Sequence, residues 1–154
     1  MLRLSVPGLA PIADLVLDFN GTMARDGELL AGVASRIRQL AQQVKVHVVT
    51  GDTFGRAREA LADLPCTVHI LDPDGQSQAK LDYVNGLGPQ TVACIGNGFN
   101  DRLMMEAVAL GIAVVQAEGA SPRTLLAADV VAPTIGDALD LLLYPVRLTA
   151  TLRT

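Results

Sequence analysis

The sequence predicts an α/β protein with a single doubly wound parallel sheet and helices on both faces. Short β-branched apolar runs recur along the chain, and between them apolar residues are spaced as on one face of a helix. Parallel strands are covered on both faces and therefore form nearly continuous apolar runs, and their alternation with helices favours one sheet. At 154 residues the chain has the length of one domain. We therefore expect residues 1–154 to form one domain without a linker.

The strands and helices are expected in alternation. The expected strands are residues 15–19, 44–50, 67–71, 91–96, 112–115 and 129–132. Helices are expected at 33–44, at 57–64, around Lys80, at 103–110 and at 139–143. The polar segment 22–30 is expected to form a small hairpin or flap. The tail 145–154 begins with Pro145, which stops a helix, and its two leucines pack on the body or on a neighbouring chain.

Composition and charge exclude several classes of function. Half of the residues are apolar and 18% are charged, which excludes long disorder. The chain has 12 basic and 16 acidic residues, a net charge of −4 and no basic run, so neither nucleic acid nor an anionic membrane surface is an expected partner. No apolar run approaches the roughly 18 residues of a membrane span, and a cytoplasmic protein is expected. Cys66 and Cys94 lie in apolar strand contexts and are expected to be buried free thiols.

Polar residues follow three of the expected strands, at the point where each strand ends. Ligands of open α/β sheets bind beyond the carboxyl ends of the strands. The first strand leads into Asp18-Phe19-Asn20-Gly21-Thr22, the second into Thr50-Gly51-Asp52, and the fourth into Gly96-Asn97-Gly98-Phe99-Asn100-Asp101. Lys80 lies early in the helix before the fourth strand.

With these segments in this order, the chain resembles the phosphohydrolases of the haloacid dehalogenase (HAD) superfamily. The motifs of that superfamily are Asp-x-Asp-x-Thr, a strand-terminal Ser or Thr, a Lys, and Gly-Asp-x-x-x-Asp or Gly-Asp-x-x-Asn-Asp. The likeness covers nearly the whole chain. Its Gly-x-Gly-x-Asn-Asp form and the stretch 107–121 are most similar to the phosphorylation domain of P-type ATPases, in particular to small soluble relatives.

The resemblance implies a Mg²⁺-dependent hydrolase that forms an aspartyl phosphate on Asp18. It assigns catalytic roles to Asp18, Asn20, Thr50 and Lys80, with the Thr50 hydroxyl and the Lys80 ammonium on the phosphate. It assigns substrate contacts to Gly21, Thr22, Gly51 and Asn100. It places Mg²⁺ between Asp18, the backbone carbonyl of Asn20, Asn97 and Asp101. The partner is then a phosphorylated small molecule or macromolecule.

Two departures from the superfamily pattern affect this expectation. Asn20 replaces the second Asp of the first motif, which acts as general acid and base, so turnover is expected to be slow. Asn97 replaces a carboxylate that binds the metal, so Mg²⁺ is expected to bind only at high concentration. Both residues precede glycine, which suits a tight turn. A second hypothesis is that these Asn-Gly pairs deamidate and partly restore an Asp.

The gaps between the motifs leave no room for a cap domain. Residues 22–50 and 50–80 are each filled by one helix, one strand and short connections. The nucleotide-binding insert and the membrane helices of P-type ATPases are also missing, which excludes ion pumping. The open site is then covered by a homo-oligomer, by the tail or by a large substrate.

Other functions remain open or are disfavoured. A catalytically weakened phosphate- or phosphoprotein-binding protein is the main alternative, because Asn20 and Asn97 replace acids. A response-regulator domain is disfavoured because the acceptor Asp comes first, and a dehalogenase because it needs no metal. Asp52 and Thr53 are expected to cap a helix rather than to catalyse, and His47 and His69 to lie in the core or at its rim.

Overall fold

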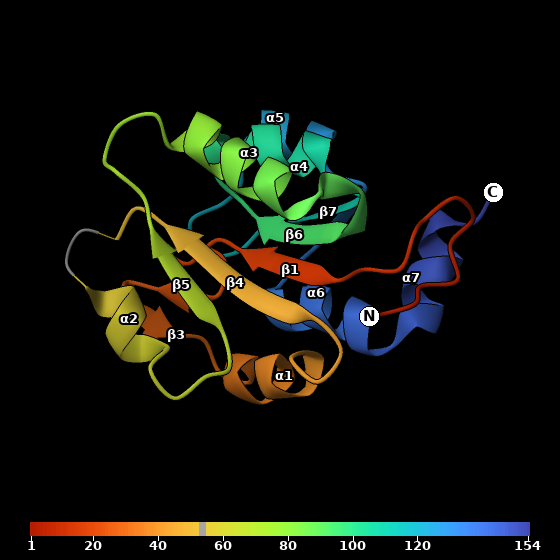
Figure 1. Cartoon of the computed structure of the whole chain (residues 1–154), viewed down its shortest axis with the longest axis horizontal. Coiled ribbons are helices and arrows are strands. Elements are labelled where there is room, and N and C mark those ends of the chain that lie inside the picture. The colour runs from red at the N-terminus through yellow and green to blue at the C-terminus, as the bar shows by residue number, and fades with distance from the viewer. Residues whose placement is uncertain (53–54) are drawn as a thin grey trace.

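The central element of the fold is a parallel sheet of six strands. The computed structural model describes residues 1–52 and 55–154. The strands are β1 (Asp14–Leu17), β4 (Lys45–Thr50), β5 (Thr67–Ile70), β6 (Val92–Gly96), β7 (Leu110–Val114) and β8 (Val130–Ala132), in the order β5-β4-β1-β6-β7-β8. The order reverses beside β1, so the loops after β1 and its neighbours open to a common crevice. The predicted strands and their parallel arrangement are confirmed (Figure 1).

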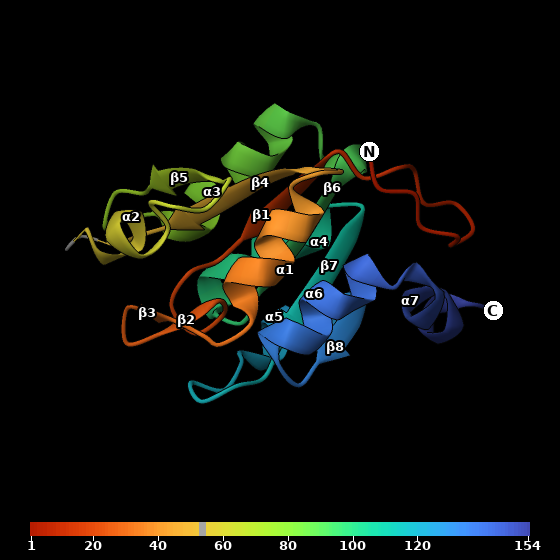
Figure 2. The ribbon, with the colours of Figure 1, turned by 90° about the horizontal axis from the view of Figure 1, so that it is seen from below.

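Helices cover both faces of the sheet (Figures 1 and 2). The helices are α1 (Val33–Leu40), α2 (Arg56–Ala60), α3 (Gln76–Leu87), α4 (Arg102–Ala107), α5 (Pro122–Ala127), α6 (Ile135–Leu143) and α7 (Pro145–Leu152). Successive side chains of a strand point to opposite faces. In β1, Leu15 and Leu17 belong to the core cluster that includes residues of α1, α2, α6 and α7, whereas Val16 belongs to the cluster that includes residues of α3, α4 and α5. The fold is therefore the doubly wound α/β sheet that the sequence predicts.

The segment after β1 forms a small hairpin beside the sheet. Its strands β2 (Ala24–Arg25) and β3 (Glu28–Leu29) pair antiparallel, and Asp26 and Gly27 at the turn both have positive φ. Arg25, Asp26 and Glu28 are exposed, as expected for a solvated flap. Between β1 and β4 the chain adds only this hairpin and α1.

Two expectations about helices need correction, and one helix was not expected. Pro145 does not merely end a helix: it occupies the first turn of α7, where its missing N–H has no helical partner to lose. The segment 103–110 is not all helix, because α4 ends at Ala107 and Leu110 begins β7 between β6 and β8. The sequence reasoning also missed α5, whose six residues are too few to show a helical repeat.

The tail packs away from the carboxyl ends of the strands. Leu148 is fully buried in the core, and α7 lies at the opposite end of the molecule from α2 and the hairpin (Figures 1 and 2). The tail therefore does not cover the crevice, which removes one of the three expected ways of closing it. No helix within residues 1–52 and 55–154 has both the length and the apolarity that a membrane crossing requires. The expected helix cap at Thr53 lies outside the described residues.

Candidate active site

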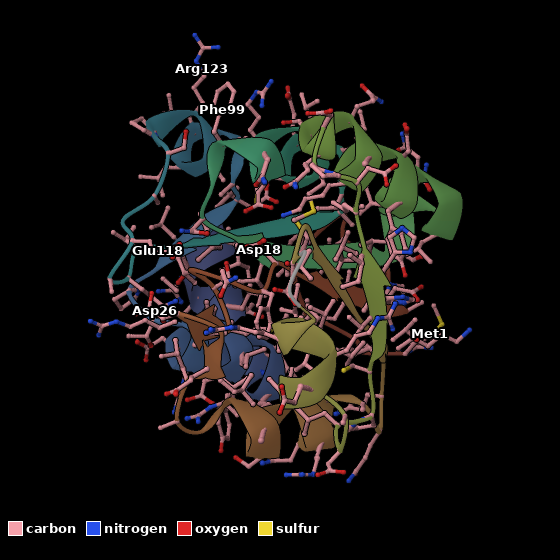
Figure 3. All side chains as sticks on the ribbon, turned by 90° about the vertical axis from the view of Figure 1, so that its left-hand side faces the viewer. Met1, Asp18, Asp26, Phe99, Glu118 and Arg123 are labelled. Carbon is pink, nitrogen blue, oxygen red and sulfur yellow. The ribbon has the colours of Figure 1, made fainter. Side chains whose placement is uncertain are left out.

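A cleft of about 640 Å³ lies at the carboxyl edge of the sheet. Figure 3 looks onto this edge and labels Asp18, Phe99 and Glu118, which line the cleft. The full lining is Asp18, Asn20, Thr50, Gly51, Asp52, Gln76, Asn97, Gly98, Phe99, Asn100 and Glu118. The loops after β1, β4, β6 and β7 all contribute, so the structure brings together the segments that the sequence singled out.

Asp18 lies directly after β1 at the base of the cleft. Its backbone N–H donates to the Ile95 carbonyl (3.1 Å), which continues the pairing of β1 with β6 by one residue. Its carboxylate is nearly buried and is held on both oxygens: Lys80 Nζ lies 2.8 Å from Oδ1, and the Thr22 hydroxyl donates to Oδ2 (3.0 Å). These contacts fix the carboxylate in a single orientation at the edge of the cleft.

Lys80 supplies the positive charge of the site from behind Asp18. It lies in the second turn of α3, is 1% exposed, and donates to Asp18 and to Asp101 Oδ1 (2.6 Å). Burial alone lowers the pKa of Lys80, but the charges of Asp18 and Asp101 together outweigh it and raise the pKa above its ordinary value. Lys80 is therefore charged at neutral pH and partly neutralises two acids.

Asp101 is fully buried behind the cleft. Its Oδ2 accepts the backbone N–H groups of Asn97 (3.1 Å) and Gly98 (3.0 Å), and its Oδ1 accepts from Lys80. Burial, followed by the charge of Asp18, raises the pKa of Asp101 to about 6. Asp101 is not part of the cleft lining, and both of its oxygens are engaged. This arrangement favours a positioning role for Asp101 over the direct metal contact that the sequence predicts.

Asn97 presents its amide oxygen toward Asp18. Its Nδ2 donates to the Gly119 carbonyl (3.1 Å), which fixes which end of the amide faces the cleft. Its Oδ1 lies 3.4 Å from the Thr22 hydroxyl, the group that also bonds Asp18. An amide oxygen is therefore oriented where the superfamily pattern has a carboxylate.

Asn20 is exposed at the cleft, and its side chain is tied to the hairpin. Its Oδ1 accepts the Gly27 N–H at 3.1 Å. Gly21 follows with φ of +82°, a left-handed conformation that favours glycine, and donates its N–H to the Ala24 carbonyl. The tight turn between β1 and the hairpin thus brings the Asn20 backbone to the cleft. This agrees with the explanation that the Asn-Gly pair serves a tight turn.

The remaining predicted residues line the cleft from β4 and η2. Thr50 is the last residue of β4 and Gly51 follows it, and a Cβ at position 51 would collide with the Gln76 amide. Asn100 lies in the 3₁₀ turn η2 (Phe99–Asp101), and its Nδ2 donates to Gln76 Oε1 (2.9 Å). Asp52 also lines the cleft and accepts the Ala57 N–H at the start of α2 (2.7 Å), which confirms its predicted capping role.

Sequence reasoning missed three residues of the site: Gln76, Gln116 and Glu118. Gln116 Nε2 donates to the carbonyls of Gly21 (3.1 Å) and Thr22 (2.7 Å), and Glu118 lines the cleft. Gln116 and Glu118 follow β7, so the rule that led to the other strand ends would have found them. Gln76 carries no comparable signal, because it lies at the start of a helix.

The donor set of the cleft suits a hard divalent cation. Among the described residues that line the cleft, the ionisable side chains are the acids Asp18, Asp52 and Glu118, and Arg56 lines an adjoining pocket with Asp52 and Glu118. Carboxylate, amide and carbonyl oxygens are the donors that Mg²⁺ takes. Within the described ranges no three His, Cys, Asp or Glu residues cluster as a preformed metal site. The side chains of Asp18 and Asn97 and the Asn20 carbonyl could hold such an ion, with water completing its shell.

Comparison with solved structures identifies the class of this fold. The cobalt-bound deoxy-D-mannose-octulosonate 8-phosphate phosphatase of Haemophilus influenzae superposes with a TM-score of 0.73 at 19% identity, over 94% of each chain. The 3-deoxy-D-manno-octulosonate 8-phosphate phosphatase of Moraxella catarrhalis, in complex with magnesium, phosphate and KDO, gives 0.72 at 14% identity over 90% of each chain. A putative HAD superfamily (subfamily III A) hydrolase of Legionella pneumophila gives 0.72 at 18% identity, over 92% of this chain and 87% of that one.

The chain therefore has the fold of the HAD superfamily, and no cap domain interrupts it in the described residues. An uncharacterized protein of Methanocaldococcus jannaschii is 50% identical over 62 residues, which are 40% of this chain and 67% of that protein. The chain belongs to the same family as that protein. No family model matches the chain. The likeness to P-type ATPases stays a prediction from the motifs.

Proposed function

We propose that this protein is a phosphohydrolase that depends on a divalent cation and works through an aspartyl phosphate on Asp18. The main support for the proposal is the position of the Asp18 carboxylate and its two hydrogen bonds. One carboxylate, held on both oxygens by Lys80 and Thr22, lies at the base of an open cleft at the carboxyl edge of a HAD fold. A carboxylate in this setting can act as a nucleophile toward phosphorus.

The proposed hydrolysis has two steps, the formation of the aspartyl phosphate and its hydrolysis. An oxygen of Asp18 attacks the phosphorus of a phosphate monoester, and the bond between phosphorus and the ester oxygen breaks, so that the leaving alkoxide takes a proton from solvent. Water then attacks the aspartyl phosphate, which releases inorganic phosphate and restores the carboxylate. When bound, a divalent cation neutralises charge on the transferring group. Lys80 fixes Asp18, and the Thr50 hydroxyl and the Asn100 amide lie where they can donate to phosphate oxygens.

The charge of the cleft supports the cation requirement. The described lining of the cleft holds three acids and no base, so a phosphate dianion that enters it meets repulsion, and Lys80 is buried behind Asp18. A cation held by Asp18, Asn97 and the Asn20 carbonyl would reverse the sign of the potential at that point. We propose Mg²⁺ for this role; the Haemophilus influenzae structure carries cobalt and the Moraxella catarrhalis structure carries magnesium. We also propose that Asp101 positions Lys80 and the loop at Asn97 without itself binding the ion.

Asn20 is expected to make turnover slow. Its amide cannot give or take a proton in either step, and its oxygen is engaged by Gly27. A general acid or base contributes on the order of 10²- to 10⁴-fold in rate. We expect substrates with good leaving groups, such as acyl and aryl phosphates, to be cleaved faster than alkyl phosphates, because they need no proton in the first step.

A catalytically weakened phosphate-binding protein is the second candidate. It is favoured by the amides at positions 20 and 97 and by the hydrogen bond that engages Asn20 with the hairpin. The two functions differ in whether Asp18 becomes covalently modified.

The test is a phosphatase assay combined with trapping of the intermediate. The full chain is incubated with acetyl phosphate, p-nitrophenyl phosphate and 3-deoxy-D-manno-octulosonate 8-phosphate, with Mg²⁺ or with a chelator. Borohydride reduces an aspartyl phosphate to homoserine, which peptide mass spectrometry locates. We expect Mg²⁺-dependent phosphate release and homoserine at position 18, and both are lost in Asp18→Asn. Phosphate binding without release or trapping would instead support the second candidate.

A further inference from the structure

The turn after β7 brings one additional carboxylate to the cleft. Gln116 and Gly119 close a tight turn through the hydrogen bond from the Gly119 N–H to the Gln116 carbonyl (2.9 Å), and Gly119 has φ of +72°. Glu118 lies inside this turn, is exposed, and lines the cleft with Asp18 (Figure 3). In residues 1–52 and 55–154 its carboxylate receives no hydrogen bond and forms no ion pair. This carboxylate is therefore uncommitted.

Hydrogen bonds on both sides hold the turn against the catalytic loops. The Gln116 side chain donates to the carbonyls of Gly21 and Thr22, and its Oε1 accepts the Ile135 N–H (2.9 Å). The Gly119 carbonyl accepts the Asn97 amide at 3.1 Å. The turn is thus anchored to the loop after β1 and to the loop after β6. The position of Glu118 in the cleft follows from these anchors.

The space beside Gly21 shows how near Glu118 lies to the proposed metal donors. A Cβ at Gly21 would collide with the carboxylate of Glu118 and would lie 2.7 Å from Asn97 Nδ2 and 3.0 Å from Asn97 Oδ1. Glu118 and the Asn97 amide therefore border the same small space beside the loop after β1. A side chain at position 21 would occupy this space and displace the Glu118 carboxylate or the Asn97 amide.

We infer that Glu118 supplies the negative charge that Asn97 lacks and binds the divalent cation of the site, directly or through a bound water. This inference rests on the proposed function, because it concerns the same cation. Asn97 contributes an oxygen without charge, and Asp101 is set back behind the cleft, which leaves Asp18 as the one charged donor of the proposed set. A second carboxylate on an anchored turn increases the affinity of an oxygen site for Mg²⁺ or Mn²⁺ through its charge. Asp52 is less suited to this role because its Oδ2 caps α2.

The test measures Mn²⁺ affinity by electron paramagnetic resonance of the free ion, with the full chain and without substrate. Glu118→Gln keeps the size of the side chain and removes its charge, and we expect the Kd for Mn²⁺ to rise about tenfold. Asp26→Asn is the matched control: it removes one exposed carboxylate from the hairpin, and Asn accepts the positive φ of that position (51°). Its Kd should stay close to that of the original chain. Asn97→Asp in the Glu118→Gln background should restore most of the affinity.

Each outcome decides the inference. An unchanged Kd in Glu118→Gln, or equal losses in Glu118→Gln and Asp26→Asn, overturns it. If the original chain binds Mn²⁺ and releases phosphate in either case, the proposed function stands while the role of Glu118 falls. If the original chain binds no Mn²⁺ and activity ignores chelators, the cation requirement of the proposed function fails as well.

Discussion

Strand β1 connects two polar clusters that differ in their position and in their charge. At its start, Asp14 Oδ1 lies 2.7 Å from His47 Nε2, and His47 Nδ1 lies 2.8 Å from the Tyr83 hydroxyl. Just beyond its end, Asp18 contacts Lys80, which also contacts Asp101. Helix α3 provides both Tyr83 and Lys80, less than one turn apart. The same two elements therefore support both clusters.

The difference between the clusters lies in where they are placed and in their charge. The Asp14 cluster contains one acid and a histidine whose two ring nitrogens are both engaged. The Asp18 cluster contains two acids and one lysine, and Asp18 borders a cleft whose loops offer further polar groups. A buried carboxylate therefore does not define a site by itself. The reactive one lies at the edge where the loops of several strands converge.

The largest effect on stability is expected from Lys80→Met. The substitution leaves Asp18 and Asp101 buried without the cation that lies between them. Removing one partner of a buried charge cluster destabilises a protein by about 3–5 kcal/mol. Urea unfolding should show this loss, together with the loss of phosphatase activity. A stability within experimental error of the original chain would contradict the role given to Lys80.

Asn20→Asp should increase activity at the Asp18 cluster. The new carboxyl group restores the missing proton donor and acceptor, which is worth on the order of 10²-fold in rate at the low end of the range for general acid–base catalysis. The gain should be greater for alkyl than for aryl phosphates, because the poorer leaving group has more need of a proton. Steady-state kinetics on one substrate of each kind measures the ratio. An equal effect on both substrates would show that leaving-group protonation does not limit the reaction.

His47→Phe tests the Asp14 cluster. Unlike Asn20→Asp, it should lower the stability and leave the activity unchanged. It leaves the buried Asp14 and the half-buried Tyr83 hydroxyl without their shared partner, and a buried polar group that loses its partner costs about 1–3 kcal/mol. Thermal unfolding should detect the loss, while activity at saturating Mg²⁺ stays near that of the original chain. His69→Phe, at an exposed position beside Tyr83, is the control and should change neither quantity appreciably. If His47→Phe abolished activity, the proposed division between the clusters would be wrong.

The ion pair Arg36–Asp140 is more exposed than either cluster, and we expect it to contribute less to stability. Arg36 donates to both oxygens of Asp140 (2.7 and 3.1 Å), which joins α1 to α6, and its hydrogen bond lowers the pKa of Asp140. A lowered pKa in the folded state contributes stability at neutral pH that disappears as the pH falls below about 4. Asp140→Asn should therefore cost about 0.5–1 kcal/mol at pH 7 and much less near pH 2. Urea unfolding at the two pH values measures this. An equal loss at both would mean that the charge of Asp140 is not what stabilises the pair.

The sequence predicted the sheet well because its central strands β1, β6 and β7 are covered on both faces. The run at residues 92–96 is buried throughout, and neighbouring residues of a strand face opposite sides of the sheet, so such a run indicates a sheet with helices on both faces. The helix ends were less predictable. The apolar periodicity at 103–110 continues smoothly into a strand, so the change from α4 to β7 at Val108 depends on pairing with β6 and β8.

The candidate site was predictable in its residues but not in their contacts. Motif order indicated Asp18, Thr50, Lys80 and Asn97, and the structure brings these segments to one edge. The buried position of Asp101 behind Lys80, however, follows from packing between α3 and the loop after β6, which spacing along the chain does not reveal. Glu118 lies in the stretch 107–121 and follows β7, but only the ends of three earlier strands had indicated site residues. The sequence does not reveal the anchoring of its turn by Gln116 and Gly119, which holds Glu118 at the cleft.

The phosphorylation of Asp18 is tested most directly by a crystal structure of the protein with Mg²⁺ and beryllofluoride, which mimics a phosphorylated carboxylate. The account predicts beryllofluoride bonded to Asp18, with its fluorine atoms near the Thr50 hydroxyl and the ion near Asn97. Crystals in which the ion is bound but Asp18 carries no beryllofluoride, or in which another side chain carries it, would contradict the account.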